Sequence, residues 1–341
     1  MKAVVYRKKE GLLVEDVAKP EPGAGEVVLK IANTGFCSSD QIRIESGELP
    51  DGLILGHETS GVVAEVGGKV TGLQPGMRAI VRPTFCGHCR SCRLGRPYLC
   101  QNGRHTIGIG DMPGAFAEYI KVHPSMIIPI PNGVSSRNAA LAESFASALH
   151  GIRCAGSTGG AALVRGGGPI GLATIQLLKL RNFGPIVLSE PVAEKRELGR
   201  RFGADRAVDP FSEDLPGITQ EQTKKEGFAT VLECSGAPGN AQLALDLAAQ
   251  GGSVCIVSRI VKPIAIDRPM TINLKECKLT GSISNTHEEN IRCLQWMADG
   301  RIDGLPLISD LVSLDQLPAV YRERIRPGKI VKAMVRIGDE F

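Results

Sequence analysis

The sequence lacks long apolar runs and long blocks of one charge sign. A membrane-spanning helix needs about 18 consecutive apolar residues, and no such run occurs. The amino terminus turns charged at Arg7–Lys9, before an apolar signal segment can form. The 40 basic residues are interspersed among 36 acidic ones, with a net charge of +4 and no basic stripe. Internal repeats and low-complexity tracts are also missing. These absences predict a soluble, cytoplasmic protein with no nucleic-acid or membrane partner.

The sequence changes character twice along its 341 residues, a length that favours two domains. Short β-rich runs with Gly and Pro turns extend to about residue 130. From a predicted helix at Ala139–Cys154 onward, apolar strands alternate with amphipathic helices, as a parallel α/β domain requires. A helix at Ile291–Ala298 and a last strand at Lys329–Ile337 follow. We therefore expect an α/β protein with a mainly β part over 1–150, a doubly wound parallel sheet over 151–290, and a segment over 291–341 that returns to the first part.

Four of the ten cysteines lie within fifteen residues. They form the pattern C-x2-C-x2-C-x7-C, made by Cys86, Cys89, Cys92 and Cys100. This spacing lets a loop over residues 83–103 wrap four thiolates tetrahedrally around one zinc ion and leaves no open position, so the site is interpreted as structural. A rubredoxin-like iron site and a set of unligated thiols are the alternatives. His88, inside the loop, is interpreted as a solvated turn residue.

A glycine-rich segment follows an apolar strand and opens a helical run. It satisfies G-x-G-x-x-G with Gly166, Gly168, Pro169, Ile170 and Gly171. Glycines in this context permit a tight turn and a close approach of the backbone to a pyrophosphate, which the helix N-terminus attracts. Glu190 follows the next strand, where a carboxylate accepts hydrogen bonds from the adenosine ribose and repels a 2′-phosphate. The pattern predicts NAD rather than NADP, although Arg196 lies close enough to favour some NADP binding.

Two further segments carry a resemblance to a known family. Gly56, His57, Glu58, Gly61, Gly67 and Val70 form G-H-E-x2-G-x5-G-x2-V, and residues 35–40 read G-F-C-S-S-D. The chain resembles the zinc-containing medium-chain dehydrogenases, the family of alcohol, sorbitol and threonine dehydrogenases. The resemblance implies a GroES-like catalytic domain with an inserted Rossmann domain, and self-association as a homodimer or homotetramer through a strand near residues 279–283.

The same resemblance implies a catalytic zinc site. It makes Cys37 and His57 ligands and expects a third ligand at Glu143, while Glu58 is an alternative to Glu143 or to water, and the choice stays open. It places Asp40 behind a ligand imidazole and makes the Ser39 hydroxyl a proton relay. Relatives often end this relay at a histidine where this chain has Ile42. Lys332 falls where relatives carry a base that meets the cofactor pyrophosphate.

These observations together predict an oxidoreductase with two zinc ions per chain, one catalytic and one structural. It would transfer a hydride between NAD and a secondary alcohol or polyol, such as a sugar alcohol, a cyclitol or a 3-hydroxy amino acid. One rival interpretation is a zinc-free enone or quinone reductase of the same superfamily, which would lack Cys37, His57 and the cysteine loop. Another is a cofactor-binding sensor without catalysis, because a fold alone does not prove a function.

Overall fold

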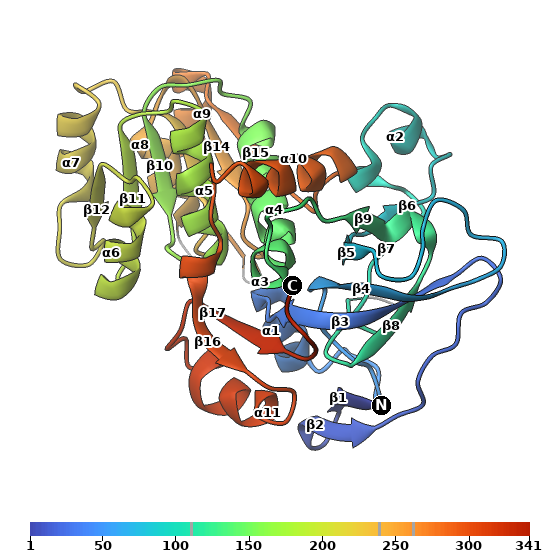
Figure 1. Cartoon of the computed structure of the whole chain (residues 1–341). Coiled ribbons are helices and arrows are strands. Elements are labelled where there is room, and N and C mark those ends of the chain that lie inside the picture. Colours follow the sequence, from blue (N-terminus) through green and yellow to red (C-terminus); the bar gives the residue numbers. More distant parts are fainter. Residues whose placement is uncertain (110–111, 238–239, 261–262) are drawn as a thin grey trace. The chain divides into compact units, whose positions relative to one another are not determined.

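The chain folds into two compact units (Figure 1). The computed structural model describes residues 1–109, 112–237, 240–260 and 263–341. Unit 1 contains Met1–Glu143 and Thr286–Phe341, and unit 2 contains Ser144–Asn285. The carboxyl-terminal segment therefore belongs to the same unit as the amino terminus. Both boundaries fall a few residues before the expected positions 150 and 290.

The main sheet of unit 1, within its described residues, has seven strands. Their order is β16-β17-β3-β4-β5-β9, and β8 pairs with β3 off this path. All pairings are antiparallel except that of β16 with β17. The strands are β3 (Val27–Gly35), β4 (Glu58–Val66), β5 (Arg78–Val81), β8 (Tyr119–Val122), β9 (Ile127–Pro129), β16 (Ile308–Val312) and β17 (Lys332–Arg336). The last strand of the chain thus completes a sheet built by the first segment.

Smaller elements complete unit 1. In the part of unit 1 that the structure describes, two strand pairs lie outside the main sheet: β1 (Lys2–Arg7) with β2 (Gly11–Asp16), and β6 (Thr84–Phe85) with β7 (Arg104–His105). The helices are α1 (Ser38–Ser46), α2 (Arg90–Arg93), α3 (Ser136–Ala140), α10 (His287–Ala298) and α11 (Leu317–Val320). The helix expected at 291–298 starts earlier because Thr286 and Glu289 form a capping box. The helix expected at 139–154 is two helices, α3 and α4 (Ala142–Ala155), with Leu141 between them; from Ser144 onward α4 belongs to unit 2.

Aromatic packing joins the two sequence segments of unit 1. The rings of Phe36 and Phe116 stack at 5.7 Å, and the ring of Tyr321 lies 5.5 Å from Phe36. All three rings are buried within one apolar cluster, together with Leu55 and Val335. Because Phe36 directly precedes Cys37, this core anchors the loop that carries the first predicted metal ligand.

Unit 2 is built around six parallel strands in its described part, in the order β12-β11-β10-β13-β14-β15. The strands are β10 (Ala162–Arg165), β11 (Ile186–Ser189), β12 (Arg206–Val208), β13 (Phe228–Glu233), β14 (Ala248–Ile256) and β15 (Lys278–Gly281). The strands β10, β11 and β13 are buried over nearly their whole length, which explains their continuous apolar character. The order reverses direction between β10 and β13, the position where ligands bind in doubly wound sheets.

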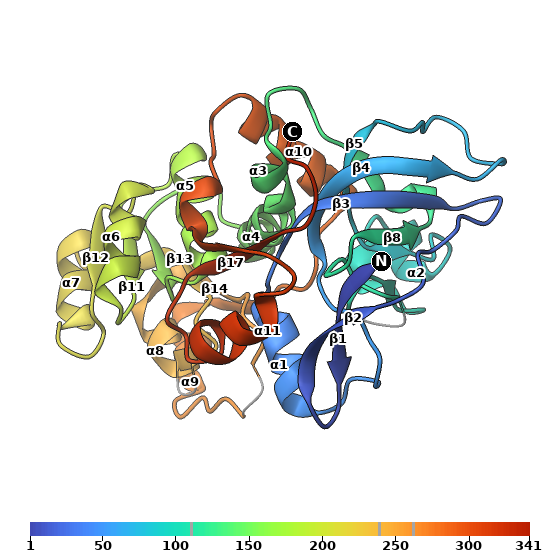
Figure 2. The same cartoon turned by 60° about the horizontal axis from the view of Figure 1, so that its bottom comes forward.

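Helices flank the sheet of unit 2 (Figures 1 and 2). They are α5 (Pro169–Leu180), α6 (Ala193–Arg201), α7 (Leu215–Gln222), α8 (Asn240–Leu247) and α9 (Met270–Lys275). The helices α5 and α6 contact β10, β11 and β12, while α8 and α9 contact β14. This arrangement confirms the α/β fold class expected from the sequence, with a Rossmann-like parallel sheet.

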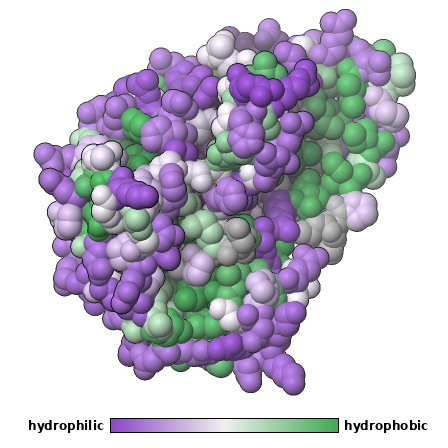
Figure 3. Space-filling model, turned by 90° about the vertical axis from the view of Figure 1, so that its right-hand side faces the viewer, coloured by the Kyte–Doolittle hydropathy of each residue, from purple (hydrophilic) through white to green (hydrophobic). Residues whose placement is uncertain are grey.

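Large apolar side chains at the surface come from several elements of the chain. Phe211, Leu274 and Leu94 are among the most exposed, and one face of the molecule shows hydrophilic residues around separate hydrophobic patches (Figure 3). Among the described residues, none of the helices combines the length and the apolar character that a bilayer crossing demands.

Candidate functional site

The end of β3, the start of β4 and the middle of β17 meet at one point of unit 1. The antiparallel register pairs Gly35, the last residue of β3, with Glu58, the first residue of β4, and with Met334 of β17. Cys37 follows β3 as the N-cap residue of α1, and His57 directly precedes β4. The register therefore brings one ligand atom each of Cys37, His57 and Glu58 within 4.8 Å of one another. Thiolate, imidazole and carboxylate are ligands that zinc accepts, so the donor set fits this metal.

Asp40 organises this cluster from the first turn of α1. Its Oδ1 lies 3.3 Å from Nδ1 of His57, and its Oδ2 accepts a hydrogen bond from the backbone N–H of Cys37 at 3.1 Å. Asp40 is fully buried, and His57 is nearly so. The Ser39 hydroxyl lies 3.4 Å from the other ring nitrogen, Nε2. Since Asp40 faces Nδ1, Nε2 is the nitrogen left for a metal. The role of Asp40 behind a ligand imidazole stays a prediction.

The charges around His57 decide its protonation in the metal-free protein. Burial by itself would lower the pKa of the His57 imidazole. The negative charges of Asp40 and Cys37 outweigh that effect and raise the pKa well above its ordinary value of 6.5. A metal ion must therefore displace a proton from this imidazole when it binds.

Glu58 has a partner that the sequence reasoning did not foresee. Its two carboxylate oxygens accept hydrogen bonds from Nζ of Lys332 at 2.8 and 2.5 Å, and the same ammonium group donates to the backbone carbonyl of Phe36 at 3.2 Å. Gly35 makes room for this carboxylate, because a Cβ at that position would lie 2.3 Å from Oε2 of Glu58. Burial would lower the pKa of Lys332, but the charge of Glu58 raises it. The expected contact of Lys332 with a pyrophosphate stays a prediction.

Glu143 lies at the start of α4 and is not part of the 4.8 Å group. Its carboxyl group is electrostatically coupled to the cluster. Desolvation raises its pKa, the nearby His57 lowers it, and Glu58 raises it further. Of the two glutamates that the sequence left as alternatives, Glu58 is the one within ligand reach of both Cys37 and His57. Ligation by Glu143 stays a prediction.

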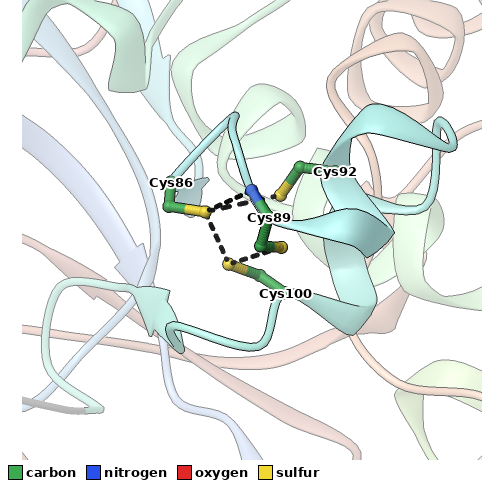
Figure 4. A group of neighbouring side chains, drawn as sticks. All are labelled: Cys86, Cys89, Cys92 and Cys100. Atoms are coloured by element: carbon green, nitrogen blue, oxygen red, sulfur yellow. Dashed lines mark hydrogen bonds between the residues drawn. The ribbon is translucent and has the colours of Figure 1, made fainter.

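The cysteine loop forms a second possible metal site (Figure 4). The sulfur of Cys86 lies 3.9 Å from that of Cys92 and 3.5 Å from that of Cys100, and the sulfurs of Cys89 and Cys100 lie 3.9 Å apart. A tetrahedral zinc ion with Zn–S bonds of about 2.3 Å requires S···S edges of about 3.8 Å. The four side chains point toward a common centre, so their geometry fits a closed zinc site.

The lobe around these cysteines supports that geometry. Its base is the pairing of β6 with β7, and the short helix α2 carries Cys92. Backbone hydrogen bonds from Cys92 and Gln101 lower the pKa of the Cys89 thiol to about 6, which favours the thiolate that zinc binds. The Nδ1 atom of His88 lies 2.8 Å from the carbonyl oxygen of Cys86, and the side chain is exposed. His88 is therefore a turn residue, as expected, and not part of the four-sulfur group.

The glycine-rich loop of unit 2 connects β10 to α5. Gly166 adopts a left-handed φ of +98°, and a Cβ there would meet the backbone of Ser235 at 2.8 Å. Gly168 is the N-cap residue of α5, and Pro169 and Ile170 form its first turn, which Gly171 continues. A Cβ on Gly168 would meet nothing within 4 Å, so this side of the loop is open in front of a twelve-residue helix. Such an opening at a helix N-terminus fits a pyrophosphate.

Glu190 lies beside this loop. Its carboxylate accepts hydrogen bonds from the backbone N–H groups of Gly167 at 2.6 Å and of Val192 at 2.9 Å. Arg196 donates to the carbonyl oxygens of Glu190 and Pro191 and approaches Asp209 at 3.4 Å. The guanidinium group thus supports the turn after β11 instead of standing free beside the carboxylate.

A buried ion pair under the loop escaped the sequence reasoning. Arg165 ends β10 and Glu233 ends β13; both are nearly inaccessible, with their charged groups 3.8 Å apart. Glu233 also accepts a hydrogen bond from the backbone N–H of Ser235 at 2.7 Å. The sequence did contain a signal for this pair, because one charged residue directly follows each of the two apolar strand cores. The carboxyl ends of neighbouring parallel strands share an edge of the sheet, so such residues can meet there.

Comparisons with known proteins cover nearly the whole chain. Residues 23–132 match the family described as alcohol dehydrogenase GroES-like domain, and residues 169–299 match the family described as zinc-binding dehydrogenase. The chain is 30% identical to L-threonine 3-dehydrogenase of Rhizobium etli (strain CIAT 652) over 98% of each chain. It is 34% identical to the enzyme of that name from Aeromonas hydrophila, over 78% of this chain and 80% of the relative.

Solved structures show the same likeness. A protein of Sinorhizobium meliloti 1021, provisionally described as a zinc-binding dehydrogenase and bound to NADP, is 32% identical, with a TM-score of 0.89 and 98% of each chain covered. The 2R,3R-butanediol dehydrogenase of Bacillus subtilis is 27% identical, with a TM-score of 0.88, over 98% of this chain and 99% of that chain.

Proposed function

Because the chain belongs to the zinc-type medium-chain dehydrogenases, we propose that it transfers a hydride between a secondary alcohol and NAD. The observation that carries this proposal is the convergence of Cys37, His57 and Glu58 within 4.8 Å of one another. These side chains come from two separate segments, before α1 and at the start of β4, in a chain that also has a glycine-rich dinucleotide loop. The family membership and the donor set both argue against a zinc-free enone or quinone reductase.

The residues of the cluster receive the following roles. Cys37 and the Nε2 atom of His57 would hold the catalytic zinc, and Glu143, Glu58 or water would complete its ligand set. Zinc in such a site supplies Lewis acidity, which lowers the pKa of a bound hydroxyl group. Asp40 keeps the imidazole in the orientation and tautomer that leave Nε2 free.

Ser39 is proposed as the first proton acceptor. Its hydroxyl lies 3.4 Å from Nε2 of His57, next to the place where an alcohol would be held. A hydroxyl can accept one proton while it donates another, so it can pass the alcohol proton onward. Since Ile42 cannot continue this relay, the proton leaves through water or the cofactor ribose.

NAD is the proposed cofactor, bound with its pyrophosphate at Gly166, Gly168 and the first turn of α5. The carboxylate of Glu190, held beside Gly167, supports this choice because it can accept hydrogen bonds from the ribose hydroxyls and would repel a 2′-phosphate. Arg196 is engaged with backbone carbonyls and Asp209, which limits its help to NADP. A relative 32% identical is bound to NADP, so the ratio of kcat/KM values for the two cofactors is the direct test.

The proposed substrate is a secondary alcohol whose neighbouring carbon carries oxygen or nitrogen. The names of the relatives support this class, since both threonine and 2,3-butanediol have that arrangement. Sugar alcohols, cyclitols and 3-hydroxy amino acids share it. The test is a screen of NAD reduction over these compounds, with simple primary alcohols for comparison.

The screen needs two matched variants. Cys37→Ala should abolish turnover and remove one zinc per chain, whereas Cys86→Ala should remove the other zinc and chiefly lower stability. Near-normal turnover by Cys37→Ala would contradict the proposed site. A protein that binds zinc and NAD but oxidises none of the panel would instead favour the non-catalytic sensor.

Self-association is proposed through the end of the unit 2 sheet. The strand β15 pairs on one side with β14 and is the last strand in the described order. Ile283, just beyond it, is 58% exposed. An unpaired strand edge with an exposed apolar residue suits pairing with a second copy. Light scattering would separate a homodimer from a homotetramer, and Ile283→Lys should reduce the mass to that of the monomer.

A further inference from the structure

The ion pair of Glu58 and Lys332 is buried beside the predicted metal ligands. Glu58 is 0% exposed and Lys332 2% exposed, so neither charge is stabilised by bulk water. Both oxygens of the carboxylate contact the single ammonium group, at 2.8 and 2.5 Å. Removing one partner of a buried pair leaves an uncompensated charge, which is strongly unfavourable. Each residue therefore compensates the charge of the other inside unit 1.

Glu58 lies within reach of two different cations. Its carboxylate belongs to the 4.8 Å group with Cys37 and His57, and so it can reach a metal held there. The same oxygens are bound by Lys332, which reaches them from β17 across a separation of 274 residues. The carbonyl of Phe36, the residue before Cys37, holds the ammonium group at 3.2 Å. The position of Lys332 is thus defined by the same loop that supplies a metal ligand.

We infer that Lys332 is a positioning residue that holds the Glu58 carboxylate away from the metal and keeps one coordination position open for substrate. This inference rests on the proposed zinc site. It assigns Lys332 a role inside unit 1 and explains why a carboxylate next to the metal need not close the site. Without Lys332, the Glu58 carboxylate would lose the ammonium group that binds both of its oxygens, and it would be free to turn toward a metal held by Cys37 and His57.

The test uses full-length protein with cobalt(II) in place of zinc, because cobalt absorption reports the ligands around the metal. Imidazole added from outside should change the wild-type spectrum by entering the open position. The four-thiolate site at Cys86, Cys89, Cys92 and Cys100 is closed, so its bands should not respond and serve as an internal control. Metal affinity is measured in parallel by competition with a chelator.

Lys332→Met replaces the ammonium group with an apolar side chain of similar length. The variant should lose the imidazole response and bind the metal about tenfold more tightly or more, the scale typical of changes around metal ligands. Lys332→Arg should keep both wild-type properties, because a guanidinium group also binds a carboxylate through two hydrogen bonds. The double variant Lys332→Met/Glu58→Gln should regain the imidazole response. A purely structural role for Lys332 would not predict this rescue.

The double variant Lys332→Met/Glu58→Gln also provides the decisive counter-test, because it removes both charges of the buried pair and leaves neither uncompensated. If Lys332 holds Glu58 off the metal, this double variant should bind the metal within twofold of wild type. A tenfold loss of affinity would show that Glu58 is a resting ligand and would overturn the inference, as would a normal imidazole response in Lys332→Met. Should Lys332→Met not fold, the double variant and Lys332→Arg carry the test. An imidazole-responsive site in a protein that oxidises no alcohol would refute the proposed function and leave the role of Lys332 standing.

Discussion

Replacing Asp40 by asparagine changes the charge of one buried group while preserving its shape. The carboxylate performs two tasks: Oδ2 accepts a hydrogen bond from the Cys37 N–H at 3.1 Å, and Oδ1 faces Nδ1 of His57 at 3.3 Å. A carboxamide has only one oxygen, and its other terminal atom is a donor. The side chain of the Asp40→Asn variant therefore cannot serve both Cys37 and His57 as an acceptor.

The two orientations of the new side chain fail for different reasons. If its oxygen faces the Cys37 N–H, its amino group faces Nδ1, and the imidazole must carry its proton on Nε2, where the metal should bind. If its oxygen faces His57, its amino group opposes the Cys37 N–H, and a buried donor without a partner costs about 1–3 kcal/mol. Bulk water cannot relieve either conflict, since the exposed fraction of Asp40 is 0%.

The expected result is a weaker metal site in a folded protein. Loss of a carboxylate behind a ligand imidazole typically lowers metal affinity by about 10–100-fold, which corresponds to about 1.4–2.8 kcal/mol. Competition with a chelator measures this affinity, and metal binding by the four cysteines of the loop, none of which contacts Asp40, is the control. An affinity within twofold of wild type would refute the assignment of Asp40 as the residue that orients His57.

Three further predictions follow from the same structure. Glu190→Ala should shift the ratio of kcat/KM for NAD over NADP toward NADP by about tenfold or more, because one charge-assisted hydrogen bond to a ribose hydroxyl is worth about 1.5–3 kcal/mol; an unchanged ratio would contradict the role of Glu190. Cys86→Ser should release one zinc and lower the melting temperature, while dinucleotide affinity, measured by calorimetry, should persist because the glycine-rich loop belongs to unit 2. The affinity of the His57 site for zinc should continue to rise with pH above 6.5, the ordinary pKa of an imidazole. The reason is that the pKa of His57 is raised and zinc requires its neutral form. In the metal-free protein, folding stability has the opposite dependence on pH. The contribution of protonated His57 to this stability is complete below pH 6.5, and it is lost as the pH rises through the raised pKa. A chelator titration that is flat above pH 6.5 would contradict the raised pKa.

The sequence by itself determined the features that depend on neighbouring residues. The spacing of Cys86, Cys89, Cys92 and Cys100 predicts a four-thiolate group because one short loop carries all four, and the structure brings their sulfurs together. The glycine pattern after an apolar strand and before a helix likewise predicts the loop at Gly166–Gly168, which the structure places between β10 and α5. Local spacing constrains local geometry, so these predictions required no knowledge of the rest of the chain.

Tertiary structure decided what meets across long separations. Cys37 and His57 were identified only through a family resemblance, and the register of β3 with β4 brings them together. The partner of Lys332 could not be read from any pattern, because strand pairing places it beside Glu58, 274 residues away. A strand's own residues define its pleat and buried face, but its neighbours and register depend on the packing of the whole sheet. The group of four thiols is therefore encoded locally, whereas the group of Cys37, His57 and Glu58 depends on the completed fold of unit 1.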